Sequence, residues 1–407
     1  MSTNKLEAVF RPRARLLRLL GESLLRDEVI ALIELVKNSH DADASFVEVQ
    51  LHDVSDKEGK VVVRDDGSGM TLDKMLGTWM EPGTDDKHRN KYTPSGRRVL
   101  GEKGIGRFAA DKIAERLELV TKTKDSKKEI YAVFDWSKYD EAVYLDQVSN
   151  HVEEREPETI KEQGTQLTLS RLRTAWNRNM VDKLHMGLLR LVSPLRKIEG
   201  FEIRLIAEDF PALVGEMRED IFEMALYRIE ARVNTDGKIT FRLNDKETRE
   251  FHFVKNKKEA APECGSFKVE LYAWELTSAA LQPLGIGVTK ARQLIRSWSG
   301  VNIYRDLFRI LPYGEQGEDW LELDRRRIED PTVHFSRNQI LGFVHITSES
   351  NTKVVDQTNR EGLIQNAAYF DFRQVILQIV RRLENCHRQV PIGFQNFPIG
   401  SCILYSF

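Results

Sequence analysis

The sequence lacks the usual marks of a secreted or membrane protein. No apolar run approaches the roughly 20 residues that a helix needs to span a bilayer, and the N-terminus shows no apolar core of signal-peptide length. The cysteines Cys264, Cys386 and Cys402 are far apart and form no CxxC pair. This pattern disfavours a disulfide framework or a cysteine metal site, and it indicates a reducing cytoplasm.

The sequence also has little net charge of either sign. Its 61 Lys and Arg residues nearly balance 63 Asp and Glu residues, which gives −2. No global field therefore favours nucleic acid or an anionic membrane, although a local basic face is compatible with this balance. What is present is a globular composition, 41% hydrophobic and 30% charged over 407 residues, enough for two or three domains.

Hydrophobic periodicity predicts a first α/β domain over residues 1–200. Residues 14–39 have an apolar stripe at helical spacing, and a further helix is expected from Gly106. Strands are expected at 46–51, 61–65, 117–123, 129–136 and 165–170. Residues 81–100, rich in Pro, Gly and charged residues, predict a long loop or lid, which we extend to about 81–105. The acidic stretch 146–163 predicts an exposed excursion.

A second α/β domain is expected over residues 201–389. The pattern predicts strands at 201–207, 228–233, 238–243, 250–254, 266–273, 301–310 and 341–347, and helices at 213–227 and 363–385. Residues 390–407 form an apolar, uncharged tail without clear periodicity, to which no role is assigned.

Three polar residues of the first helix share one face. Glu34, Asn38 and Asp41 are spaced i, i+4 and i+7, while apolar residues form the other face. Such a face is ordinarily a solvated surface. The alternative is a ligand site, because carboxylate and amide oxygens suit Mg²⁺ and a carboxylate beside a water can act as a general base.

Two glycine-rich segments and one threonine follow in order. Asp65 ends a strand before Gly67, Gly69 and Met70, which is either an Asp-Gly turn or an acceptor for an exocyclic amine beside a backbone that a planar base can approach. The loop Gly101–Gly106 precedes a helix, where backbone N–H groups can cradle phosphate. Thr165 opens a later strand, and sequence alone does not bring it to Asp65.

In this order and spacing, the motifs resemble those of the GHKL superfamily of DNA gyrase B, ninety-kilodalton heat-shock chaperones, histidine kinases and MutL. The resemblance covers about residues 14–172. It implies an α+β fold: a two-layer α/β sandwich (the Bergerat ATP-binding fold) with a mixed sheet and helices on one face, followed by a transducer-like α/β domain. It is closest to the chaperone, MutL and MORC-like branch.

The resemblance also implies roles for particular residues. Glu34 would activate the attacking water, Asn38 would hold Mg²⁺, and Asp65 would bind the adenine amine of ATP. Asp41 would lie near the nucleotide or brace the lid. The expected nucleotide-binding residues are Asn38, Asp41, Asp65, Gly67, Gly69, Met70, Lys87, Gly101, Lys103, Gly104, Ile105, Gly106 and Thr165.

In the gyrase, chaperone and MutL branches, a basic residue of the transducer domain reaches the γ-phosphate. The stretch 358–366 resembles the chaperone segment that carries this residue, and it makes Arg360 the catalytic candidate, with Arg337 as a rival. The resemblance further implies a nucleotide-dependent homodimer, with DNA or a client protein as a possible partner. The arginine-rich segment 11–18 is either an arm that crosses to the second protomer or a helix packed against its own domain.

Two other functions compete with an ATPase that switches conformation. One is a histidine kinase, but kinases of this superfamily generally lack a Glu at the Glu34 position, and no His precedes it here. The other is a nucleotide-binding module that does not hydrolyse ATP. Glu34 is the residue that distinguishes these possibilities from an ATPase.

Overall fold

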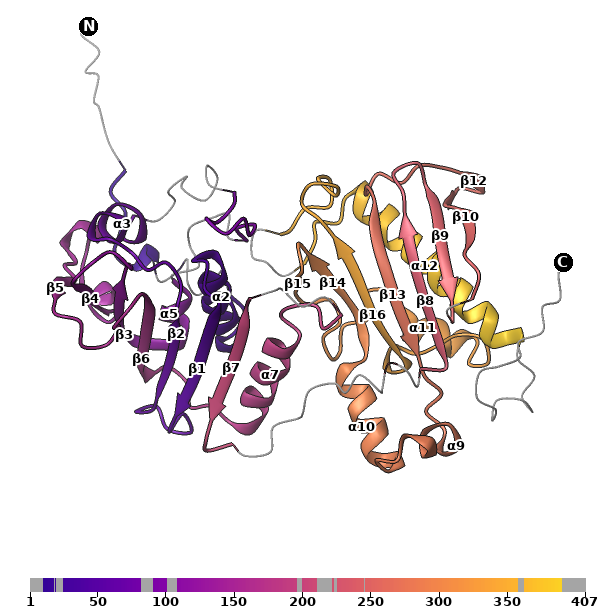
Figure 1. Cartoon of the computed structure of the whole chain (residues 1–407), viewed down its shortest axis with the longest axis horizontal. Coiled ribbons are helices and arrows are strands. Elements are labelled where there is room, and N and C mark those ends of the chain that lie inside the picture. The colour runs from indigo at the N-terminus through magenta and orange to yellow at the C-terminus, as the bar shows by residue number, and fades with distance from the viewer. Residues whose placement is uncertain are drawn as a thin grey trace, which may run out of the picture. The chain divides into compact units, whose positions relative to one another are not determined.

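A computed structural model describes residues 10–17, 19, 25–81, 91–100, 108–195, 200–210, 222, 225–244, 246–357 and 362–389. These residues divide into two compact units (Figure 1). The first contains the described residues up to Leu191 together with 200–210. The second contains 192–195 and the described residues from 222 onward.

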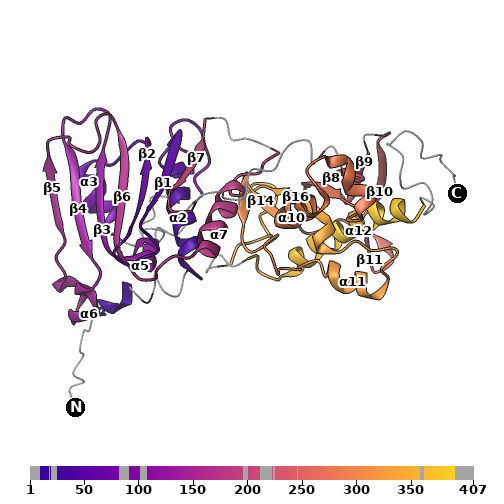
Figure 2. The same ribbon diagram turned by 90° about the horizontal axis from the view of Figure 1, so that it is seen from below.

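The first unit is built on a seven-stranded mixed sheet. Its strands are β1 (Phe46–His52), β2 (Lys60–Asp65), β3 (Ala114–Lys122), β4 (Glu129–Asp135), β5 (His151–Arg155), β6 (Gly164–Leu172) and β7 (Glu202–Ala207), in the order β5-β4-β3-β6-β2-β1-β7. All neighbours are antiparallel except β1 and β7, which are parallel. Figure 2 shows these strands side by side.

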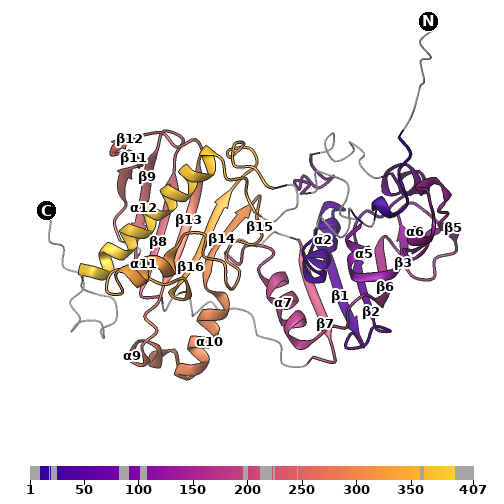
Figure 3. The same ribbon diagram turned by 180° about the vertical axis from the view of Figure 1, so that it is seen from behind.

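Helices cover one face of this sheet. They include α2 (Glu28–Asp41), α5 (Ala109–Ile113) and α7 (Arg178–Leu189), of which α5 and α7 both pack against α2; shorter helices are α3 (Leu72–Lys74) and α6 (Lys138–Glu141). They lie behind the sheet in Figure 1 and in front of it in Figure 3. Alternate residues of β1 are buried on this side, as expected for a sheet with one covered face. The expected two-layer α+β architecture is confirmed.

Three expectations for the first unit are wrong in detail. Strand β3 begins at Ala114 rather than 117, because its residues pair with β4 and β6 and this pairing outweighs their helix propensity. The stretch 146–163 is largely exposed as expected, but it is not a plain excursion, because it contains β5, an edge strand paired with β4. The strand expected at 201–207 pairs with β1, so it belongs to the first sheet rather than to a second domain.

The second unit contains another seven-stranded mixed sheet. Its strands are β8 (Tyr227–Val233), β9 (Lys238–Leu243), β10 (Arg249–His252), β13 (Phe267–Ala273), β14 (Gly300–Arg305), β15 (Phe308–Ile310) and β16 (Ile340–Ile346), in the order β10-β9-β8-β13-β16-β14-β15. Only β14 and β16 are parallel neighbours. A small hairpin joins β11 (Val254–Lys255) to β12 (Lys258–Glu259).

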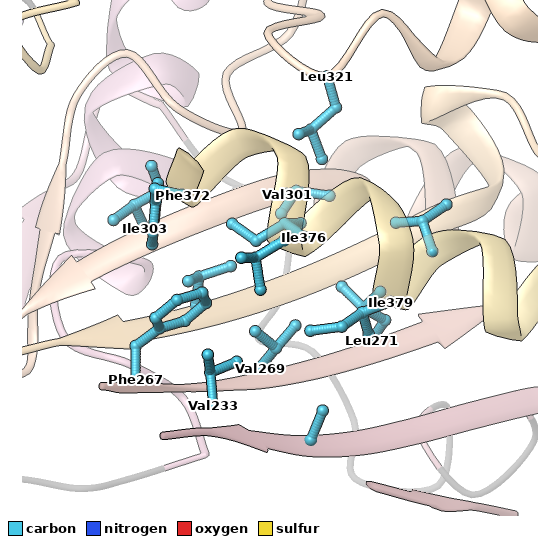
Figure 4. Packing of buried hydrophobic residues seen from close by; sticks show 14 of the residues in the cluster. Val233, Phe267, Val269, Leu271, Val301, Ile303, Leu321, Phe372, Ile376 and Ile379 are labelled. Atoms are coloured by element: carbon cyan, nitrogen blue, oxygen red, sulfur yellow. The ribbon is translucent and has the colours of Figure 1, made fainter. Parts of the chain in front are cut away.

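Helix α12 (Ala367–Gln389) covers one face of this second sheet (Figure 3). Phe372, Ile376 and Ile379 are fully buried against alternate residues of β13, including Val269 and Leu271 (Figure 4). This apolar contact is the core of the unit. The other helices are α9 (Ser278–Leu281), α10 (Val288–Trp298) and α11 (Leu323–Glu329).

The sequence predicted the sheet of this unit better than its helices. The strand expected at 301–310 is two strands, because the backbone turns at Asp306 and Leu307, both of positive φ. The expected strand 250–254 is likewise divided between β10 and β11. Of the helix expected at 213–227, Tyr227 opens β8, while residues 211–221, 223 and 224 lie outside the described residues, as does the tail 390–407. Within the described part of the chain, no helix is both long and apolar enough to cross a membrane.

Candidate nucleotide-binding site

Helix α2 has a defined start and end. Asp27 caps its N-terminus by accepting the backbone N–H of Ile30 at 3.0 Å, and Glu28 places a negative charge in the first turn. At the other end, Asp43 adopts φ +66°, a left-handed conformation that stops the helix. The candidate residues Glu34, Asn38 and Asp41 therefore occupy the second half of a well-bounded helix.

The polar face of α2 is not a solvated surface. The side chains of Glu34 and Asp41 are 4% and 5% exposed, and Asn38 is half-buried. Glu34 Oε1 accepts a hydrogen bond from Lys37 Nζ at 2.9 Å. Buried carboxylates are uncommon unless paired. The ordinary reading of this face as a water-exposed surface is therefore excluded for Glu34 and Asp41.

The carboxylate of Asp65 lies beside this helix, at the end of β2. Its Oδ2 accepts the hydroxyl of Ser39 at 2.8 Å, and its Oδ1 accepts the backbone N–H of Gly67 at 3.0 Å. Ser39 follows Asn38 directly, so this bond joins the α2 motif to the Asp65 motif. The sequence reasoning missed Ser39, although its position inside the first motif could have identified it.

Burial raises the pKa of the Asp65 carboxyl to about 6, although part of the residue reaches solvent. The hydrogen bonds from Ser39 and Gly67 oppose this rise, and the charge of Asp66 adds to it. A carboxylate can accept about four hydrogen bonds. Among the described residues, Ser39 and Gly67 supply two, and the backbone N–H of Thr165 also stabilises the charged form, so acceptor capacity is left for a ligand.

The adjacent Asp66 is used differently. Its Oδ1 accepts the backbone N–H groups of Ser45 and Phe46, each at 2.8 Å, at the start of β1. Burial would raise the pKa of Asp66, but these bonds and the Ser45 hydroxyl outweigh it and lower the pKa. Asp66 therefore fixes the backbone at the start of β1, whereas Asp65 can still accept a hydrogen bond from a ligand.

Thr165 lies opposite Asp65 in the β2–β6 ladder. The hydroxyl of Thr121 donates to the carbonyl of Gly164 at 3.1 Å and accepts the backbone N–H of Met70 at 3.0 Å. Thr121 Oγ1 is also 3.0 Å from Thr165 Oγ1. Either hydroxyl can be the donor in this pair, and a Thr hydroxyl can donate one hydrogen bond and accept up to two.

Gly67 and Gly69 have packing roles within the protein. A Cβ on Gly67 would lie 2.7 Å from the carbonyl oxygen of Ala42, and one on Gly69, where φ is +64°, would overlap the carbonyl oxygen of Lys122. The glycines thus let the turn after β2 pass close to the end of α2 and to β3. The sequence left two interpretations open, an Asp-Gly turn and the approach of a planar base, and these contacts agree with the turn.

The segment 91–100 is bound to the end of α2. Asp43 accepts the Thr93 hydroxyl at 2.7 Å and the Ser95 backbone N–H at 3.0 Å. Burial raises the pKa of Asp43, but these hydrogen bonds and the nearby Arg97 guanidinium more than reverse the effect, so its pKa is lowered. The sequence reasoning missed Asp43, which the helix-ending position after Ala42 could have suggested.

Two further bonds fix this segment. Asp41 Oδ1 accepts the backbone N–H of Leu100 at 2.8 Å. Arg97 donates to the carbonyl of Ala44 and, at 2.7 Å, to that of Gly200. Leu100 immediately precedes the Gly101–Gly106 loop in the sequence. The second half of the expected lid is therefore attached to the helix that carries Glu34.

Several expected site residues lie outside the described residues: Lys87, Gly101, Lys103, Gly104, Ile105, Gly106 and Arg360. The rival Arg337 is described. Its guanidinium Nε lies 3.5 Å from the carboxylate of Asp324, within the second unit. No group of three His, Cys, Asp or Glu side chains suited to a metal occurs in the described part of the chain.

The described part of the arginine-rich N-terminal segment packs on its own unit. Arg13 forms a β-bridge with Tyr144, and the guanidinium of Arg11 lies 3.9 Å from the Tyr144 ring centroid. The backbone N–H of Leu145 donates to the carbonyl of Pro12 at 3.1 Å. Arg18 of the same segment is not among the described residues.

Comparison with known proteins agrees with this geometry. Residues 28–165 match the family described as histidine kinase-, DNA gyrase B-, and HSP90-like ATPase. The chain is 29% identical over 180 residues to heat shock protein 90-5, chloroplastic, of Arabidopsis thaliana, covering 38% of this chain and 22% of that protein. It is 28% identical over 130 residues to the chaperone protein HtpG of Shouchella clausii, covering 28% and 21%.

A putative type II restriction enzyme, HgiDII of Herpetosiphon aurantiacus, is 31% identical over 100 residues, covering 25% of this chain and 16% of the enzyme. The chain thus spans only about a fifth of the curated relatives it matches. A crystal structure of the N-terminal domain of a DNA repair protein matches with a TM-score of 0.50 and 14% identity, covering 92% of this chain and 98% of that one. At that identity, the match supports the fold alone.

The buried polar face of α2, its link to Asp65 and the family match over the same residues agree with one another. Residues 28–165 therefore form a domain of the GHKL ATPase type, the part of the chain that the family model matches.

Proposed function

We propose that this protein binds ATP with Mg²⁺ at the Asp65 end of β2 and hydrolyses it, using the cycle to change the conformation of the segment attached to α2. The observation that carries the proposal is the Ser39–Asp65 hydrogen bond of 2.8 Å. This bond connects β2, which carries the adenine-binding candidate Asp65, to α2, which carries the hydrolytic candidate Glu34.

Base recognition is assigned to Asp65 and Thr165. An adenine amine donates hydrogen bonds, and both side chains have acceptor capacity that protein groups leave unused. Thr165 lies directly across from Asp65, so the two oxygens can face one amino group. Exclusion of water from this partly buried position would strengthen each bond to a correctly placed donor.

Hydrolysis is assigned to Glu34. The side chain is buried one helical turn from Asn38, and Lys37 fixes one of its oxygens at 2.9 Å. In the proposed reaction, the Glu34 carboxylate would accept a proton from the attacking water. Asn38 fits a Mg²⁺ ligand because it offers a half-buried amide oxygen, and Mg²⁺ commonly takes one or two protein groups and completes its shell with phosphate and water. Bound Mg²⁺ would neutralise developing phosphate charge.

Coupling is assigned to Asp41 and Asp43. Both accept hydrogen bonds from the segment 91–100, which runs into the glycine-rich loop expected at the phosphates. Nucleotide binding beside α2 would therefore act on that segment, and order–disorder of such a segment is a known means of switching. Arg360 remains the candidate that reaches the γ-phosphate. A nucleotide-dependent homodimer in the cytoplasm, acting on DNA or on a client protein, is the assembly we expect from the chaperone and MutL branches.

The test uses Glu34→Ala and Glu34→Gln in the full chain. We expect both variants to bind a fluorescent ATP analogue as tightly as the unaltered protein and to lose turnover by roughly 100-fold or more. Asn38→Ala should instead weaken binding in the presence of Mg²⁺. Turnover that survives in both Glu34 variants would refute the general-base assignment. Transfer of phosphate to the protein itself would support the kinase alternative.

A further inference from the structure

A stretch of the second unit carries basic side chains and no acidic one. Between Glu275 and Asp306 the sequence contains Lys290, Arg292, Arg296 and Arg305 but no Asp or Glu, and of these Arg305 pairs with Asp356. In a chain whose acidic residues slightly outnumber its basic ones, such a run is a local departure from balance. The run contains α9 and α10, which lie at one end of the second sheet (Figures 1 and 3).

Helix α10 has one buried apolar face and one exposed face that is polar and basic. Ala291, Ile295 and Trp298 are buried, at 1%, 1% and 2% exposure. The opposite side presents exposed residues that are polar or basic and never acidic: Thr289, Lys290, Gln293 and Arg296. Lys290, Gln293 and Arg296 are spaced i, i+3 and i+6, so they follow one another along the helix surface. We call these four residues the α10 face.

Within the described part of the chain, no acidic side chain forms an ion pair with Lys290 or Arg296 of the α10 face. The neighbouring Arg292 donates to the carbonyl of Leu276 at 2.8 Å and to the hydroxyl of Ser278 at 3.3 Å, which fixes its charge beside the same face. The positive charges are therefore directed to solvent rather than used to hold the fold together.

Only part of this charge arrangement favours the helix itself. Arg296 lies in the last turn, where the helix dipole favours a cation, but Gly287 precedes α10 without a capping side chain and Lys290 places a cation in the first turn, where the dipole disfavours it. Arg292 and Arg296 form a like-charged i, i+4 pair. In contrast, α2 begins with Asp27 and Glu28. An anionic partner would offset the repulsion between these cations.

We propose that the α10 face binds the phosphate backbone of duplex DNA. Lys and Arg with neighbouring Thr and Gln side chains are the usual donors to phosphate and sugar oxygens, and they bind without reading sequence. A membrane surface fits less well, since no exposed large hydrophobic residue is found among the described residues of 276–305 to enter a bilayer. The proposal goes beyond ATP hydrolysis and requires no nucleotide.

The test compares two charge reversals in the full chain. K290E/R296E alters the α10 face, and K257E/K258E makes the same change in charge on the exposed hairpin of β11 and β12. Binding to a fluorescent duplex of about 20 base pairs is titrated without nucleotide at several salt concentrations. We expect K290E/R296E to weaken binding at least tenfold and to reduce the salt slope by about two, one unit per phosphate contact. K257E/K258E should change binding less than threefold.

Three outcomes would overturn the proposal: no binding of duplex DNA by the unaltered protein, equal losses in both variants, or binding only to phosphatidylserine vesicles. Because Lys290 and Arg296 are exposed, we expect both variants to melt like the unaltered protein, and K290A/R296A gives the same test without new negative charge. ATP turnover in the absence of DNA should be unchanged in K290E/R296E. Loss of DNA binding with normal turnover therefore separates this proposal from the proposed ATPase activity.

Discussion

Ser39 and Asp65 are hydrogen-bonded at 2.8 Å, across the interface between α2 and the end of β2. Through this bond, two motifs separated by 26 residues form one structural feature. The same carboxylate has a pKa raised to about 6 by burial. Asp65 is therefore held in place at a cost to stability, which is typical of residues kept for binding rather than for folding.

Asp65→Asn should weaken nucleotide binding without weakening the fold. The amide retains one acceptor oxygen, but it loses a charge-assisted hydrogen bond worth about 1.5–3 kcal/mol, so ATP affinity should fall roughly 10- to 100-fold. Ionising a carboxyl whose pKa rises from 3.8 to about 6 costs up to roughly 3 kcal/mol at pH 7. Removing that cost offsets the loss of one acceptor oxygen for Ser39 or Gly67, so the melting temperature without ATP should change by only a few degrees. Unchanged ATP affinity would refute the adenine assignment.

The pH dependence of binding should report the same carboxyl. Below about pH 6 Asp65 takes up a proton and loses acceptor capacity, so ATP affinity should fall as pH decreases through that value. Its effect on folding has the opposite sign. The pKa of Asp65 in the folded protein is above its ordinary value of 3.8. The protonated carboxyl therefore contributes its whole stabilisation of the fold below pH 3.8, and this contribution is lost as the pH rises through about 6.

The matched measurement is ATP affinity of the unaltered protein and of Asp65→Asn between pH 5 and 8. ATP itself gains a proton near the lower end, so the difference between the two proteins is the informative quantity. We expect that difference to diminish toward pH 5. A constant difference across the range would mean that another group causes the pH dependence.

Asp43 should control the segment 91–100. Asp43→Ala removes acceptors for Thr93 and Ser95 and places at φ +66° a residue that lacks the polar side chain by which Asp tolerates this conformation, so we expect a loss of about 2–4 kcal/mol in the stability of the unit. Protease cleavage within 91–100 should accelerate, and ATP turnover should fall about tenfold if this segment closes over the nucleotide.

Asp43→Asn is the control, because Asn tolerates the left-handed conformation and keeps one acceptor oxygen. It should retain more stability than Asp43→Ala while still weakening the contact with Arg97. If both variants leave cleavage and turnover unchanged, the attachment has no part in the ATPase cycle.

The sequence predicted those parts of the fold that local periodicity determines. The helix face that carries Glu34 follows from a period of 3.6 residues, and β2 follows from a short apolar run. Each signal lies within one short segment of the sequence. In contrast, 201–207 joins the first sheet through pairing with β1, more than 150 residues earlier in the chain. Local pattern shows that a strand exists, but it does not show which sheet the strand enters.

The candidate site shows the same limit. Spacing placed Glu34, Asn38 and Asp41 on one face, but it did not distinguish a solvated surface from the buried face that the structure has. The contacts of Ser39 with Asp65 and of Asp43 with Thr93 depend on chain segments brought together by the sheet. Such contacts involve ordinary Ser, Thr and Asp residues that carry no distinctive sequence signal.

Gly69 provides the sharpest test of the turn after β2. Gly69→Ala would combine a left-handed backbone at φ +64° with a Cβ that overlaps the carbonyl oxygen of Lys122, a backbone atom that cannot move aside alone. We expect a loss of at least about 3 kcal/mol in stability, with ATP binding lost as the Asp65 loop shifts. Gly77→Ala is the matched control, because its Cβ would meet no atom within 4 Å and φ is not positive. It should melt within a few degrees of the unaltered protein. If Gly69→Ala behaves like Gly77→Ala, the turn is not held against β3 as the structure has it, and the position of Asp65 does not depend on that close approach.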